Sequence, residues 1–98
     1  MLIKFGVYID KLNRNVRRAL PAIENTVVRV TGAEAVITST YEGNHSLASL
    51  HYENKAVDIR LPKKDVINEL RNSLRKELGK NFDVVKSNSC IHIEWDPK

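Results

Sequence analysis

The feature that most constrains the fold is the apolar stretch over residues 56–61, in which hydrophobic side chains alternate with others. A run of this kind predicts a half-buried strand, because successive side chains of a strand point to opposite faces. Val57 and Ile59 then face the core, whereas Asp58 and Arg60 emerge on the other face. The sequence therefore predicts a sheet with one buried face and one face that can carry polar chemistry.

A histidine stands seven residues before this aspartate. Asn54 lies between the two, and asparagine tolerates the positive φ of a tight reversal, which would fold His51 back beside Asp58. His92 lies in a second alternating run, residues 90–95. Two histidines and a carboxylate are the ligand set of an open zinc site. We therefore expect His51, Asp58 and His92 to bind Zn²⁺.

Four residues of the first stretch match a known pattern. Ser49, His51, Ala56 and Asp58 fit S-x-H-x-x-G-x-A-x-D, which resembles the superfamily of lysostaphin, D-alanyl-D-alanine peptidases and hedgehog signalling domains. The stretch is especially similar to hedgehog domains and to small phage-type D-alanyl-D-alanine carboxypeptidases. His92 stands where the second histidine of the H-x-H strand of that superfamily would fall.

The resemblance covers roughly residues 35–97 and implies a hedgehog-like, D,D-peptidase-like fold. It implies a zinc peptidase that hydrolyses a peptide bond in peptidoglycan stem peptides, with water at the fourth zinc position. The alternative is a binding module of the same fold, which keeps zinc and recognises a partner or wall peptide without cutting it. A basic structural protein of a phage particle is a third hypothesis, for which the sequence offers only charge.

Amide hydrolysis also needs a general base near the zinc-bound water. In the resembled family this base is a glutamate a few residues before the third ligand, but residues 86–89 here are Lys-Ser-Asn-Ser. Glu94 lies two residues beyond His92 on the same strand, so both side chains share a face. Glu94 is therefore the expected catalytic residue, and Glu53 and Glu42 in the preceding loop are the alternatives.

Four further residues are expected to line the site, and Ser49 of the matched pattern is the first of them. Cys90 replaces the first histidine of H-x-H and is either a fourth zinc ligand or a small buried thiol. His45 lies in the polar loop six residues before the first ligand, where hedgehog-like sequences also carry a histidine. Arg60 shares a face with Asp58 and is the cation that would pair with this aspartate without metal.

The rest of the chain predicts an α+β domain, with two helices packed on one face of a mostly antiparallel sheet. Helices are expected over residues 11–31 and 62–78, and strands over 35–40, 56–61, 82–85 and 90–95. Pro21 predicts a kink or break near Leu20, and Pro62 is expected to open the second helix. Gly32 and Gly79 are expected to end the two helices.

Composition limits the remaining classes of function. The chain has 98 residues, a net charge of +4 and one cysteine, which predicts one domain over residues 1–98 without an internal disulfide. Residues 1–10 do not suit a signal peptide or membrane span, so we expect cytoplasmic synthesis and release by other means, such as phage lysis. The basic side chains of residues 11–29 form a solvated face or a patch for an anionic polymer. No aromatic residues interleave with them, so neither nucleic acid nor a membrane is the expected partner.

Overall fold

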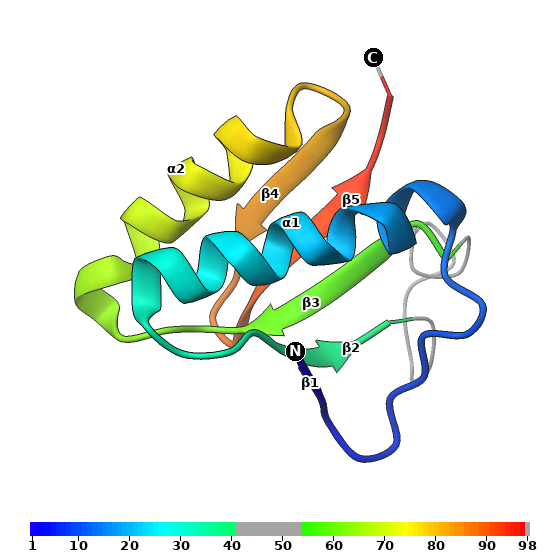
Figure 1. Ribbon diagram of the computed structural model, residues 1–98, viewed down its shortest axis with the longest axis horizontal. Helices are drawn as coiled ribbons and strands as arrows, with labels where there is room; N and C mark the ends of the chain where they lie inside the picture. The colour runs from blue at the N-terminus through cyan, green and yellow to red at the C-terminus, as the bar shows by residue number, and fades with distance from the viewer. Residues whose placement is uncertain (41–53, 98) are drawn as a thin grey trace.

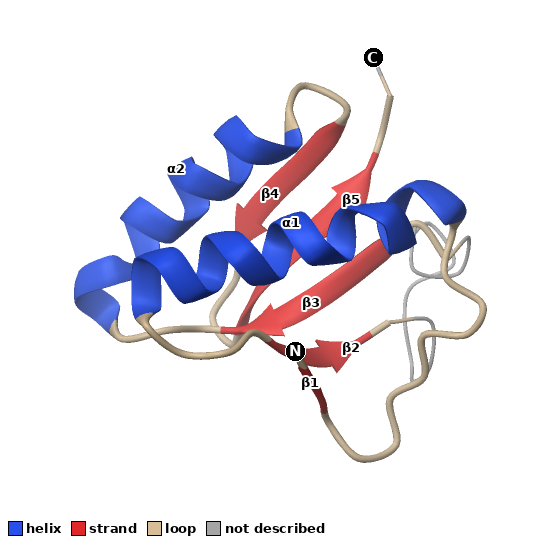
Figure 2. Ribbon diagram, viewed as in Figure 1, coloured by secondary structure: helices blue, strands red, loops and turns tan. Residues whose placement is uncertain are grey.

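The computed structural model describes residues 1–40 and 54–97. Within these residues, five strands form one sheet, and two α-helices with a short 3-10 helix complete the architecture (Figure 1). In chain order the elements are β1 (Leu2–Ile3), α1 (Arg14–Thr31), β2 (Val36–Ser39), β3 (Ala56–Arg60), η2 (Lys64–Val66), α2 (Ile67–Leu78), β4 (Phe82–Lys86) and β5 (Cys90–Trp95). Both α-helices lie on the same side of the sheet (Figure 2). The α+β prediction is therefore confirmed.

The strand order in the sheet is β1-β2-β3-β5-β4. Three of the four pairings are antiparallel, as expected, and the fourth joins β1 to β2 in parallel, which makes the sheet mixed. The edge strand β1 was not predicted, because two residues are too few to show a period. In the central pairing, Val57 lies opposite Ile93 and Asp58 lies opposite His92. The register thus places residues of like character on the same face.

The helix-covered face of the sheet forms the hydrophobic core. Its fully buried strand residues are aliphatic, and they pack in one cluster with aliphatic residues from both helices. These residues are Ile37, Val57, Ile59, Val84, Ile91 and Ile93 from the sheet and Val16, Ile23, Leu70 and Leu74 from the helices. Each such burial stabilises the fold by about 1.5–3 kcal/mol. The opposite face of the sheet is therefore available for polar side chains.

Helix α1 begins later than predicted and passes through its proline. The side chain of Asn13 caps the helix by accepting a hydrogen bond from the backbone N–H of Asn15 (2.8 Å), so the first helical residue is Arg14. Of the kink or break predicted near Leu20, the break is wrong, because the helix is continuous to Thr31. Pro21 is exposed, so the carbonyl that loses its N–H donor can bind water. Gly32 ends the helix with a φ of 77°, as predicted.

Helix α2 also begins later than predicted. Pro62 does not open it, because a 3-10 turn over Lys64–Val66 comes first and the α-helix begins at Ile67. Gly79 ends the helix as expected, with a φ of 81° and an N–H that donates to the carbonyl of Arg75. The Arg75 guanidinium donates to the carbonyl of Val84 at 2.9 and 3.1 Å and joins α2 to β4. In the described ranges, neither helix has the length and apolar character needed to span a bilayer.

Asn54 lies two residues before the first residue of β3 and adopts a turn conformation. Its φ is 60°, which confirms the positive φ expected at this position. The Asn54 carbonyl accepts a hydrogen bond from the N–H of Asn13 at 2.7 Å, so the beginning of α1 is anchored beside the beginning of β3. Asp58 is therefore held on a strand whose entry is tied to the helical layer.

Candidate metal centre

Asp58 and His92 lie side by side on the open face of the sheet. They are direct partners in the antiparallel pairing of β3 with β5. The His92 Nδ1 atom lies 2.7 Å from the Asp58 Oδ1 atom, and the two side chains are 24% and 15% exposed. Two of the three predicted zinc ligands are thus adjacent although 34 residues separate them in the chain. The third, His51, lies outside the described residues.

Glu94 occupies the other nitrogen of the same imidazole. It follows His92 by two residues on β5, so both side chains emerge on the open face. The His92 Nε2 atom lies 2.6 Å from the Glu94 Oε1 atom, and the Glu94 side chain is 21% exposed. The ring therefore stands between two carboxylates, with Asp58 at one nitrogen and Glu94 at the other.

The two carboxylates change the protonation of His92. Hydrogen bonding to Asp58 is the largest effect and raises the pKa of His92, partial burial lowers it, and Glu94 raises it further. A carboxylate oxygen accepts hydrogen bonds, so an imidazolium can donate from Nδ1 to Asp58 and from Nε2 to Glu94. A metal ion at Nδ1 would replace the proton shared with Asp58, because zinc binds neutral imidazole.

The donor chemistry at Asp58 and His92 fits zinc. Zinc binds carboxylate oxygen and imidazole nitrogen at about 2.0–2.2 Å, and two tetrahedral ligand atoms then lie about 3.4 Å apart. The observed Nδ1–Oδ1 distance of 2.7 Å would have to increase by about 0.7 Å to reach that separation. The two described residues can therefore hold the metal with small side-chain rotations, and His51 would complete the predicted set.

Cys90 lies at the beginning of β5 and contacts the preceding turn. Its Sγ atom is 3.2 Å from the Ser87 Oγ atom, and its carbonyl accepts a hydrogen bond from the Ser87 N–H at 2.9 Å. Burial raises the pKa of the Cys90 thiol, and the nearby negative charge of Asp58 raises it further. The thiol is therefore protonated at neutral pH unless a metal displaces the proton. Whether Cys90 is a zinc ligand stays a prediction.

The other predicted site residues fall in two groups. Arg60 is exposed on β3, on the same face as Asp58 and directly opposite Cys90. Asp58 forms an ion pair with His92. Ser49, His45, Glu53 and Glu42 lie outside the described residues, so their places in the site stay predictions.

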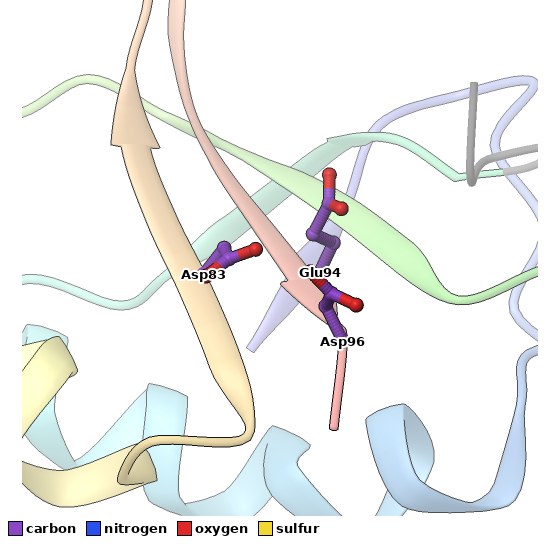
Figure 3. Close-up of side chains that lie close together, drawn as sticks. All are labelled: Asp83, Glu94 and Asp96. Carbon is purple, nitrogen blue, oxygen red and sulfur yellow. The ribbon is translucent and has the colours of Figure 1, made fainter. Parts of the chain in front are cut away.

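Sequence reasoning missed an acidic cluster at one end of the site. Oxygen atoms of Asp83, Glu94 and Asp96 lie within 4.8 Å of one another. Figure 3 shows Asp83 on β4, Glu94 on β5 and Asp96 just beyond the end of β5. The signal would have been the pairing of β4 with β5, which sets Asp83 opposite Glu94. Such groups are common on protein surfaces without a metal ion, and this cluster shares Glu94 with His92.

Comparison of the sequence with models of known protein families gives no match, and comparison with curated proteins gives none either. The similarity to D,D-peptidases thus rests on the quoted motif residues, and the function must be inferred from the chemistry of the site.

Proposed function

We propose that this chain is a zinc-binding domain of the D-alanyl-D-alanine carboxypeptidase type that acts on peptidoglycan stem peptides. The metal ligands are His51, Asp58 and His92. The observation that carries the proposal is the 2.7 Å approach of His92 Nδ1 to Asp58 Oδ1 on the open face. This arrangement of a carboxylate and an imidazole suits a three-ligand zinc site, in which His51 of the sequence motif would supply the second histidine.

The chemistry that zinc supplies when bound is a lowered pKa for its water ligand and polarisation of a substrate carbonyl. The chain itself orients the two described donors by pairing β3 with β5. Arg60 lies two residues beyond Asp58 on the same face, about 6.6 Å along the strand, and offers an exposed cation to a peptide carboxylate. A peptide with a free C-terminus is therefore the ligand class proposed for this face.

Hydrolysis also requires a general base, for which Glu94 was the first choice from the sequence. Its carboxylate is hydrogen-bonded at His92 Nε2, whereas the proposed metal lies at Nδ1, beside Asp58. A base must come within hydrogen-bond reach of the attacking water. Glu94 would have to leave the imidazole to do so, and Glu53 and Glu42 are the other candidates.

A second candidate function, the zinc-containing binding module, is favoured by a specific observation. The resembled family has its catalytic glutamate a few residues before the third ligand, where residues 86–89 here are Lys-Ser-Asn-Ser, and its first histidine is replaced by Cys90. The side chains of Ser87 and Cys90 contact each other at 3.2 Å. None of these residues is a carboxylate, so the turn before His92 supplies no general base and favours recognition without hydrolysis.

Metal analysis tests the shared part of both candidates. The purified chain should contain about one zinc per molecule by elemental mass spectrometry, and His92→Ala and Asp58→Asn should each lose most of it. Asp83→Asn is the matched control, because Asp83 lies on the same sheet face one strand away and is not a proposed ligand. Full zinc retention by His92→Ala would refute the proposal.

Kinetics then separates the two candidates. The zinc-loaded chain is incubated with D-alanyl-D-alanine and with muropeptides, and released alanine is measured. Turnover that His92→Ala abolishes supports the hydrolase. Saturable binding of a muropeptide without turnover, measured by calorimetry, supports the binding module.

A further inference from the structure

The imidazole of His92 is held from both sides. Asp58 lies 2.7 Å from Nδ1, and Glu94 lies 2.6 Å from Nε2. Asp58 reaches His92 from the neighbouring strand, where it is the cross-strand partner. Glu94 reaches His92 along β5, two residues further on. The ring of His92 therefore contacts Asp58 through one nitrogen and Glu94 through the other.

We propose that Glu94 is a positioning residue for the metal ligand His92. By accepting a hydrogen bond from Nε2–H, it holds the imidazole in the tautomer that leaves Nδ1 for zinc, and it fixes the plane of the ring toward Asp58. The inference rests on the proposed zinc site. Histidine ligands commonly donate their second N–H to a carboxylate, which orients the ring and makes the ligating nitrogen more basic.

The surroundings of Glu94 favour this role over that of a free base. Its Oε1 atom lies 2.6 Å from His92 Nε2. Oxygen atoms of Glu94, Asp83 and Asp96 also lie within 4.8 Å of one another. The contact with His92 occupies the Glu94 Oε1 atom, which a general base would need for the attacking water. Glu94 also lies on the far side of the ring from Asp58, because the two nitrogens of an imidazole point in different directions.

Zinc affinities of four proteins test the inference. The dissociation constant is measured by chelator competition for the unaltered chain and for Glu94→Ala, Glu94→Gln and Asp83→Asn. We expect Glu94→Ala to weaken zinc binding by about 10–100-fold, the usual effect of losing such a partner. Glu94→Gln should weaken zinc binding less than Glu94→Ala, because the amide oxygen of glutamine can still accept a hydrogen bond from Nε2–H. Asp83→Asn removes a neighbouring charge but leaves the imidazole contact, so its affinity should change by less than about 3-fold, as expected for a screened surface charge.

Nitrogen NMR of the zinc-loaded, unaltered chain gives a readout that needs no variant. We expect the proton on Nε2 and the metal on Nδ1 of His92. A proton on Nδ1 would overturn the inference. So would a Glu94→Ala variant that binds zinc as tightly as the unaltered chain, or an Asp83→Asn variant that loses as much zinc affinity as Glu94→Ala. Circular dichroism shows whether Glu94→Ala is folded. If it is not, the inference is tested by the position of the His92 proton in the NMR experiment and by the zinc affinity of Glu94→Gln. A chain that binds no zinc at all overturns the proposed function itself, and this inference with it.

Discussion

The two faces of the sheet differ in what holds their side chains in place. On the face covered by α1 and α2, aliphatic residues such as Ile91 and Ile93 are fully buried and are held by close packing. On the open face of the same strand, His92 and Glu94 are only partly buried and are held by hydrogen bonds. Alternate residues of β5 thus pack into the core on one face and form polar contacts on the other. Changes on the two faces should have separable effects.

The largest effect is expected on the covered face. Ile93→Ala should lower the free energy of unfolding by about 2–5 kcal/mol, because it removes buried methylene groups and leaves a cavity. Urea denaturation of the metal-free chain measures this change. The zinc affinity of the folded fraction should stay close to that of the unaltered chain, because Ile93 faces away from the proposed ligands.

The matched control lies on the open face of the neighbouring strand. Val85 is opposite His92 in the pairing of β4 with β5 and is 51% exposed. Val85→Ala should change the free energy of unfolding by no more than about 0.5 kcal/mol, as is usual for surface substitutions. Equal losses for Ile93→Ala and Val85→Ala would show that the two faces are not energetically distinct.

Metal removal should have the next largest effect, and it should act through the open face alone. Zinc that binds only the folded chain stabilises it by about 2.7 kcal/mol when the free metal is 100 times the dissociation constant. For a domain of this size, chelation should then lower the Tm on the order of 10 °C. Differential scanning calorimetry with and without chelator measures the shift, with His92→Ala as the control that should not respond. An unchanged Tm after verified metal removal would contradict the prediction.

A smaller effect is expected from pH in the metal-free chain. The pKa of His92 is raised in the folded state by Asp58 and also by Glu94, above the ordinary value of about 6.5. The stabilisation from these contacts is then fully present below about pH 6.5 and is lost as the pH rises through the higher pKa of the folded state. Urea denaturation of the chelated chain across this interval should show the decrease.

Zinc should reverse the direction of this dependence. Binding needs a neutral Nδ1, so zinc affinity should increase over the same pH interval in which the metal-free chain loses stability. His92→Ala should lack both dependences. If the metal-free unaltered chain and His92→Ala show the same pH dependence, the contacts with Asp58 and Glu94 do not contribute to stability.

Much of the local structure could be predicted because it depends on short patterns. The alternating runs predicted β3 and β5, positive φ was expected at Asn54, and Gly32 and Gly79 were expected to end the helices. The errors came from tertiary context. Pro21 is tolerated because it lies on the exposed side of α1, and the two-residue strand β1 has no readable period.

For the described residues of the proposed site, the sheet face that each occupies could be predicted from the sequence, but not every contact among them. The contact between His92 and Glu94 follows from strand alternation, since residues two apart share a face. The contact between His92 and Asp58 depends on the register of two strands far apart in the chain, which hydrophobic patterning alone does not fix. The same holds for Asp83, which reaches Glu94 only through the register of β4 with β5.

The most direct test of the central claim is a crystal structure of the zinc-loaded chain with the metal located by anomalous scattering at the zinc edge. We predict one strong peak within about 2.0–2.2 Å of both His92 Nδ1 and Asp58 Oδ1, with an imidazole of His51 as the third ligand. A peak at the carboxylates of Asp83, Glu94 and Asp96 instead, or a fully loaded crystal with zinc bound elsewhere, would contradict it.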